Sequence, residues 1–178
     1  MNKKGFTLIE LLATITILSM ILVVAVPSIM STLDKSKRRT YVEDAKKMIS
    51  LAEYRMRGDT SIEYPSSTTT AVAFTLASMD LTDFSEGPEG GQYDLNRSYV
   101  LLVKKNSQYY YYVTLIENYN SKYRGVEMMN YDDLIKDTAI NNVKDFKDDT
   151  LPSIPIENSY KSIESSNYLI TKVVNEKK

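Results

Sequence analysis

Residues 3–27 read KKGFTLIELLATITILSMILVVAVP, and this stretch decides the fold. Two lysines and a glycine precede an apolar run that ends at Pro27. Glu10 is the one acid inside the run, and a carboxylate carried into hydrocarbon on a helix costs roughly 2.5–3.5 kcal/mol. Glu10 therefore needs a partner that compensates its charge.

Two ordinary explanations cover parts of this stretch. Thr7 and Glu10 stand three residues apart ahead of an apolar run, which fits a capping box with Thr7 as the N-cap. A secretory signal peptide cleaved near Ala25 fits poorly, because the uncharged run is 16 residues long and Pro27 crowds the cleavage point. The capping box is compatible with a further role of Glu10.

A plain membrane anchor is a third interpretation. Residues 6–30 make about 37 Å of helix, which is enough to cross a bilayer. An anchor alone gives no reason for the Gly5-Phe6 step or for Glu10. More basic residues follow the run than precede it, so a positive-inside count favours a cytoplasmic C-terminal part. These residues are Lys35, Lys37, Arg38 and Arg39 after the run, and Lys3 and Lys4 before it.

Residues 5–10, GFTLIE, resemble the N-terminal region of a type IV prepilin, together with the two lysines before them and the long apolar run after them. The resemblance covers residues 3–30 as a motif and the rest of the chain as a layout. It implies that a membrane-embedded prepilin peptidase cuts between Gly5 and Phe6 and methylates the new amino group of Phe6. It also implies that Glu10 pairs with the cationic N-terminus of a neighbouring subunit in a fibre core, because neither charge is buried cheaply alone.

The same resemblance places the leader, residues 1–5, in the cytoplasm and the C-terminal part outside, against the charge count. The basic residues 35–39 are then expected to contact lipid head groups, to contact acids of the next subunit, or to lie on a solvated helix face. Many members of the family have a glycine halfway along the apolar run, where this chain has Ser19. Pro27 is therefore the expected site of a helix kink, because it removes an N–H and clashes with the preceding turn.

The helical pattern continues beyond Pro27. Apolar residues recur at spacings of three and four among charged ones, which predicts a single apolar stripe, and Gly58 is the expected C-terminal stop. The stripe consists of Tyr41, Val42, Ala45, Met48, Ile49, Ala52 and Met56. Residues 6–30 are thus expected to form a transmembrane and assembly half, and residues 31–57 an amphipathic half of one helix.

Residues 58–178 predict a globular head. Its first part, residues 59–97, is expected to be a long connecting loop with a short helix or strand at 71–79. The pattern then changes to a period of two, and runs at 99–104 and 108–116 predict an antiparallel hairpin that turns at Asn106-Ser107.

The rest of the head is expected to add strands around 124–129 and 168–174. Asn130 is expected to cap a helix over 131–146. The predicted fold class is α+β: a long N-terminal α-helix packed on an antiparallel β-sheet head, as in type IV pilins.

Tyr109-Tyr110-Tyr111-Tyr112 is the most conspicuous feature of the head sequence. Tyr109 and Tyr111 face one side of a strand, and Tyr110 and Tyr112 face the other. We expect one pair in the core. The other pair is expected to be covered by the 59–97 loop or a neighbouring subunit, or to form an adhesive surface.

Composition argues against several functions. The chain of 178 residues has no histidine or cysteine, no phosphate-loop motif and no compact calcium loop, so we expect neither an enzyme nor a cofactor or metal site. Without cysteine, the segment from Ile140 onward must be held by packing and hydrogen bonds alone. Loss of the leader leaves 20 basic and 23 acidic side chains, a charge of −3, which gives no basis for nucleic-acid binding. The abundance of Lys, Asn, Ile and Tyr favours a Gram-positive source.

The predicted function is that of a type IV pilus subunit. Its N-terminal helix lies in the membrane before assembly and then polymerises into an extracellular fibre used in adhesion, surface motility or aggregation. The expected partners are other pilin subunits, the prepilin peptidase and methylase, the membrane and the pilus assembly machinery. The alternatives are a pseudopilin of a secretion or DNA-uptake system and a secreted or membrane-anchored binding domain.

Overall fold

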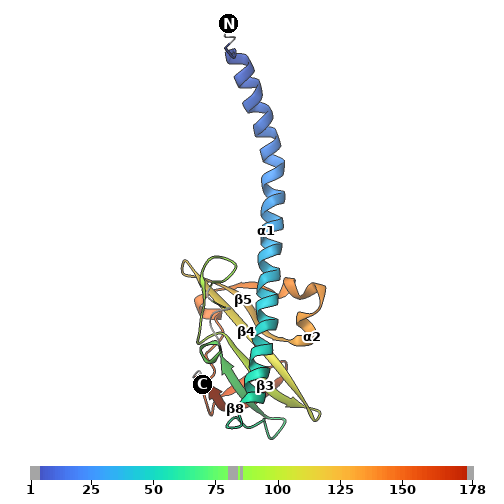
Figure 1. Cartoon of the computed structure of the whole chain (residues 1–178), viewed down its shortest axis with the longest axis vertical. Helices are drawn as coiled ribbons and strands as arrows, with labels where there is room; N and C mark the ends of the chain where they lie inside the picture. Colours follow the sequence, from blue (N-terminus) through green and yellow to red (C-terminus); the bar gives the residue numbers. More distant parts are fainter. Residues whose placement is uncertain (1–4, 80–83, 85, 176–178) are drawn as a thin grey trace. The chain divides into compact units, whose positions relative to one another are not determined.

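The computed structural model describes residues 5–79, 84 and 86–175. Lys3, Lys4 and the rest of the expected leader before Gly5 lie outside the described residues. The chain forms two compact units, one up to Ser36 and one from Lys37 to the C-terminus. Helix α1, Leu8–Gly58, contributes to both (Figure 1).

In the first unit, α1 is apolar on all sides and its side chains are almost all exposed. It contains a segment long and apolar enough to cross a membrane. Hydroxyl groups within this segment bond to carbonyl oxygens about one turn earlier, at 2.8 Å for Thr14 and Thr16 and 2.7 Å for Ser19. Such bonds satisfy polar side chains inside an apolar environment. The helix runs through Pro27 without a break, and a bend there stays a prediction.

The second unit is built on one curled sheet (Figure 1). The order of its strands is β6-β5-β4-β3-β1-β8-β7, and β2 pairs with β4. All pairs are antiparallel except β1 with β8. The strands are β1 Thr70–Thr75, β2 Gln92–Tyr93, β3 Tyr99–Lys105, β4 Gln108–Tyr119, β5 Lys122–Asn130, β6 Lys144–Phe146, β7 Tyr160–Ile163 and β8 Ser166–Val174.

The C-terminal half of α1 packs on this sheet through the predicted stripe. The buried residues of the helix are the seven that the spacing indicated, from Tyr41 to Met56. They join one apolar cluster with Val72, Phe74 and Leu102 of the sheet. The α+β fold with a long N-terminal helix packed on a mostly antiparallel sheet is confirmed.

The sheet has a second buried cluster, formed by residues that alternate with those of the first. Ala71, Ala73 and Leu101 belong to it, along with Tyr168 and Ile170 of β8. Since alternate residues of a strand face opposite sides, the sheet is apolar on both faces. The chain therefore covers both faces itself.

The predicted hairpin and the strands near 124–129 and 168–174 are confirmed. Asn106 and Ser107 both have positive φ values, 47° and 65°, as a tight two-residue hairpin turn of type I′ requires. Strand β8 lies between β1 and β7, so the C-terminal segment is held by pairing without a disulfide.

Within the loop expected at 59–97, the short helix or strand predicted at 71–79 is present as a strand, although its place inside the sheet was not expected. Residues 70–75 form β1, which lies inside the sheet between β3 and β8, and η1, Leu76–Ser78, follows it. A strand buried on both faces has no alternating pattern, which is why the sequence did not distinguish it from a helix. Residues 80–83 and 85 of this segment lie outside the described part of the chain.

The expected helix over 131–146, by contrast, was wrong in length. Asn130 does cap it and accepts from the Asp133 N–H at 2.8 Å, but α2, Tyr131–Leu134, is only one turn long. A 3₁₀ helix, η3 Asp137–Asn142, and then β6 follow. Strand β6 pairs with β5, and this pairing outweighs the weak helical pattern. The short η4, Asp148–Thr150, and β7 had no clear sequence signal.

Candidate processing and assembly site

Gly5, Phe6 and Thr7 precede helix α1, which begins at Leu8 rather than at Phe6 as expected. The Phe6 side chain is 81% exposed, and a Cβ atom added at Gly5 would meet nothing within 4 Å. The predicted cleavage point thus lies in an exposed segment without regular structure. Cleavage there and methylation of Phe6 stay predictions.

Glu10 and Thr7 form the capping box that the sequence allowed. Both the backbone N–H and the hydroxyl of Thr7 donate to Oε2 of Glu10 at 2.8 Å, and the Glu10 N–H donates to the Thr7 hydroxyl at 3.3 Å. Two of these bonds end on Oε2, and the third does not involve the carboxylate. Within the described residues, Oε1 of Glu10 has no hydrogen-bond partner, so the cap leaves half of the carboxylate available.

The four tyrosines of β4 do not divide into a buried and an exposed pair. Burial instead increases along the strand: Tyr109 is 41% exposed, Tyr110 and Tyr111 are half-buried, and Tyr112 is buried. The reason is that the sheet is apolar on both faces, which the sequence did not show. Tyr64 of the 59–97 segment covers Tyr109, with ring centroids 4.8 Å apart. Tyr112 is therefore removed from the proposed contact surface.

Two of the basic residues after the apolar run are used inside the head. The Lys37 ammonium lies 2.6 Å from a carboxylate oxygen of Glu89. The Arg38 guanidinium donates to the carbonyl oxygens of Val143 at 2.6 Å and Ile140 at 3.4 Å. These contacts replace the expected solvated face or lipid contact at both positions.

Sequence reasoning missed a buried polar cluster around Glu117 of β4. The Glu117 side chain is fully buried and accepts from the Tyr41 hydroxyl of α1 and from the Gly91 N–H at 2.7 Å. The Glu89 N–H donates to the same carboxylate at 3.1 Å. Burial, followed by the hydrogen bond to Glu117, raises the pKa of Tyr41 well above its usual value. An acid inside the apolar run of a strand was the one signal available.

A second phenol and carboxylate join α1 to β2. The Tyr93 hydroxyl donates to Asp44 at 2.6 Å, and the rings of Tyr93 and Tyr41 pack edge to face with centroids 6.3 Å apart. Burial raises the pKa of Tyr93 and also that of Asp44. The head helix is thus attached to the sheet by polar contacts as well as by its apolar stripe.

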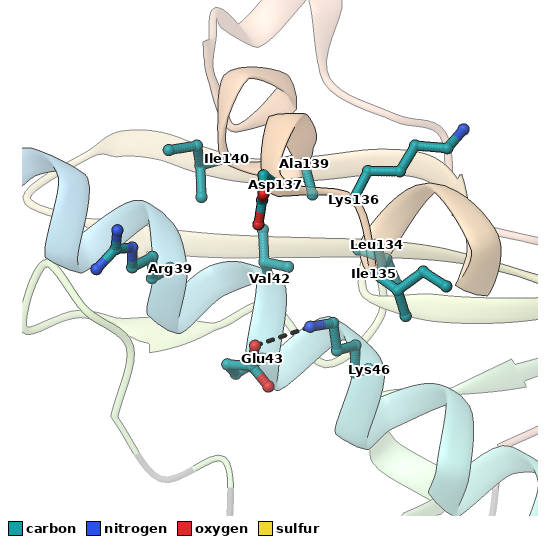
Figure 2. Close-up of a pocket in the computed structure, with 10 residues that line it drawn as sticks. All are labelled: Arg39, Val42, Glu43, Lys46, Leu134, Ile135, Lys136, Asp137, Ala139 and Ile140. Atoms are coloured by element: carbon teal, nitrogen blue, oxygen red, sulfur yellow. Dashed lines mark hydrogen bonds and ion pairs between the residues drawn. The ribbon is translucent and has the colours of Figure 1, made fainter.

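Figure 2 shows a groove of about 530 Å³ between α1 and the segment from α2 to η3. Its lining mixes both charge signs with apolar side chains and includes a Glu43–Lys46 ion pair of 2.8 Å. The lining residues are Arg39, Val42, Glu43, Lys46, Leu134, Ile135, Lys136, Asp137, Ala139 and Ile140. Among the described residues that line it, none is a nucleophile activated by a base. In residues 5–79, 84 and 86–175, no group of three or more acidic side chains is placed to hold a metal ion.

A family model described as the prokaryotic N-terminal methylation motif matches residues 1–26. The N-terminus is a type IV pilin-type leader. The comparisons with curated proteins and with solved structures found no match. The match thus covers the cleavage point, Glu10 and most of the apolar run, and it does not extend to the head.

The pilin-type leader supports a protein of the type IV pilin or pseudopilin class, which points to a structural subunit rather than an enzyme. It implies processing by a prepilin peptidase and assembly with other pilin subunits. Together with the apolar segment of α1, it is consistent with membrane anchoring before assembly.

Proposed function

We propose that this chain is a structural subunit of a type IV pilus that polymerises through residues 6–36 into an extracellular fibre. The observation that supports it most is the combination of the pilin-type leader with an acid inside an uncovered apolar helix. Large apolar side chains such as Leu8, Ile15 and Val24 are each more than half exposed. Exposing so large an apolar surface to water is unfavourable, so we expect lipid and later other copies of the helix to cover it.

Glu10 supplies the polar part of this assembly. Its Oε2 atom is occupied by the Thr7 cap, whereas Oε1 has no hydrogen-bond partner in the described residues. Cleavage after Gly5 would create an ammonium group on Phe6. Paired across two copies, that cation and the Glu10 carboxylate neutralise each other, whereas either charge alone would be costly in the apolar core of a fibre.

The experiment that tests the proposal is mass spectrometry of the N-terminal peptide of this protein in fibres sheared from the cell surface. We expect a chain that begins at N-methylated Phe6. The same peptide found only in membranes would indicate a pseudopilin that forms no surface fibre. A chain that begins near Val26, or an uncut Met1, would overturn the proposal in favour of a secreted or anchored binding domain.

A matched pair of variants controls for the cleavage point. Gly5→Asn places a larger side chain beside the predicted scissile bond and is expected to leave the chain uncut and absent from fibres. Gly58→Asn makes the same change at the end of α1, where an added Cβ meets nothing within 4 Å. The second variant is expected to be processed normally, so failure of both would point to misfolding rather than to lost cleavage.

A further inference from the structure

The segment Glu86-Gly87-Pro88-Glu89-Gly90-Gly91 lies across strand β4 at Glu117. We call residues 86–91 the strap. Its backbone turns on itself, with the Gly90 N–H donating to Gly87 at 3.0 Å and the Gly87 N–H donating to Gly91 at 2.9 Å. Two further N–H groups of the strap, those of Glu89 and Gly91, donate to the buried Glu117 carboxylate. The strap is therefore fastened to β4 through its backbone.

The glycines of the strap are required by this close approach. A Cβ atom on Gly87 would lie 2.3 Å from Cδ of Glu117, and one on Gly91 would lie 2.2 Å from the carbonyl oxygen of Asn118. Gly90 has a φ of 85°, which disfavours other residues. The sequence EGPEGG is thus fitted to one position over Glu117, whereas a mobile linker would need no such fit.

Charges connect the strap to two other elements. The Glu89 carboxylate, whose side chain is 10% exposed, lies 2.6 Å from the Lys37 ammonium of α1 and 2.9 Å from the Arg124 guanidinium of β5. Glu117 accepts from the Tyr41 hydroxyl of α1. Glu89 and Glu117 therefore form one cluster with Lys37, whose side chain is 39% exposed, and with the nearly buried Arg124. The Arg124 guanidinium also lies 3.6 Å from the exposed carboxylate of Asp145. Such a cluster is sensitive to the loss of any member, because the remaining charges are left uncompensated.

The cluster lies where α1 enters the head. The second compact unit begins at Lys37, and the buried apolar stripe begins only at Tyr41. The first turn of α1 in this unit is held by polar contacts, those of Lys37 with Glu89 and of Arg38 with the carbonyl oxygens of Val143 and Ile140. Segments that bury few apolar contacts open locally at lower free energy than the core.

We propose that the strap is a clasp that fastens the first two turns of α1 in the head to the sheet, and that its release is the first local opening of the head. In a fibre, and hence resting on the proposed function, tension carried by the apolar half of α1 enters the head through these turns. The clasp then limits how far the helix separates from the sheet before the apolar core unfolds.

Hydrogen exchange measured by mass spectrometry on the full chain in detergent micelles tests this clasp without any fibre. Glu89→Gln removes the charge that Lys37 and Arg124 share. We expect exchange to rise about tenfold or more in peptides covering 86–91 and 37–41, and to stay unchanged in β1 and β3. Tenfold is the change expected when an opening free energy falls by 1.4 kcal/mol.

Glu127→Gln is the matched control. It makes the same substitution in a Glu–Lys ion pair, 2.8 Å to Lys144, that lies outside the strap. It should leave exchange at 86–91 and 37–41 as in the wild type. Lys37→Met, at a half-exposed position, serves if Glu89→Gln does not fold, and it should raise exchange in the same two segments by a smaller factor.

Two results would overturn the clasp. One is unchanged exchange at 86–91 and 37–41 in a folded Glu89→Gln or Lys37→Met protein. The other is a uniform rise across the head, including β1 and β3, which would mean that the cluster supports global stability only. Because the measurement uses unassembled protein, its failure is distinct from a failure of the pilus subunit proposal, which the N-terminal peptide decides.

Discussion

Residues 8–36 and residues 37–58 belong to one helix but meet opposite demands. The first part exposes nearly all of its apolar side chains, and its Thr and Ser hydroxyls bond back to the helix itself. The second part buries a narrow stripe against its own sheet and leaves its charged side in water. The difference shows that the chain itself buries the apolar side of residues 37–58, whereas it leaves the apolar side chains of residues 8–36 uncovered.

The carboxylates of Glu117, in the head, and Glu10, in the apolar half of α1, also differ in how many partners the chain supplies to them. Glu117 is fully buried, and its chain supplies a phenol and two backbone N–H groups to it. Glu10 has only the Thr7 cap, which uses one of its two oxygens. If Glu10 enters an apolar environment, as we propose, we expect it to need a cation that its own described residues do not supply.

The largest expected effect is a difference in the free energy of unfolding when the same Ile→Ala substitution is made in each half of α1. Ile49→Ala, in the buried stripe, should lower the free energy of unfolding of the head by about 2–5 kcal/mol, because it leaves a cavity in the core. Ile21→Ala, at a position 58% exposed, should leave that free energy unchanged. Denaturant unfolding in micelles, followed by tyrosine fluorescence, measures both. Equal losses would contradict the division of the helix.

A smaller effect distinguishes the fitted strap from the open end of the helix. Gly91→Ala should destabilise the head by about 1–3 kcal/mol, because its Cβ meets the Asn118 carbonyl oxygen. Gly58→Ala should stabilise it by about 0.4–1 kcal/mol, since nothing lies nearby and alanine restricts the unfolded chain. Thermal unfolding of both variants gives the signs. A stable Gly91→Ala protein would show that the strap is not tightly fitted.

We expect high pH to destabilise the second unit and not residues 5–36, because residues 5–36 contain no tyrosine. Burial raises the pKa of Tyr41 and Tyr93 above the usual value near 10, and raises that of Tyr99 to about 12. Above pH 10 the unfolded chain loses these protons while the folded chain keeps them. The stabilisation is therefore fully present well below pH 10 and is lost as the pH rises above 10, at a rate that approaches about 1.4 kcal/mol per pH unit for each such tyrosine.

Tyr93→Phe isolates one of these contributions. The variant removes a titrating group without removing its ring, so the fall in stability between pH 10 and pH 11 should be smaller by about 1 kcal/mol. Urea titrations at several pH values measure the slope. The same slope in the variant and the wild type would mean that Tyr93 ionises equally in the folded and unfolded chain.

Local sequence patterns predicted the elements whose signal is local. Helical spacing found every residue of the stripe from Tyr41 to Met56, and period-two runs around Asn106-Ser107 found the hairpin. The pattern indicated a short element at 71–79 but did not decide between helix and strand, because a strand buried on both faces, such as β1, does not alternate. It also extended α2 too far, because pairing of β6 with β5 is a long-range effect.

The functional residues also fall into a group with a local sequence signal and a group without one. The capping box and the leader are contained within residues 1–26, so the sequence alone was sufficient to find them. The Glu117 cluster joins residues 28 and 76 positions apart, and no spacing rule connects Glu117 with Glu89 or Tyr41. Its members become recognisable only when the fold brings three elements together.

The most direct test of the central claim separates the charge of Glu10 from its capping role. Glu10→Gln keeps an oxygen that accepts the Thr7 bonds but removes the charge, whereas Thr7→Ala removes the cap, at about 1 kcal/mol, and keeps the charge. The measurement is the amount of each variant in sheared fibres relative to membranes. We expect Glu10→Gln to be depleted about tenfold or more and Thr7→Ala to assemble nearly as the wild type does. Normal assembly of Glu10→Gln with loss of Thr7→Ala would show that Glu10 is a helix cap and not an assembly charge.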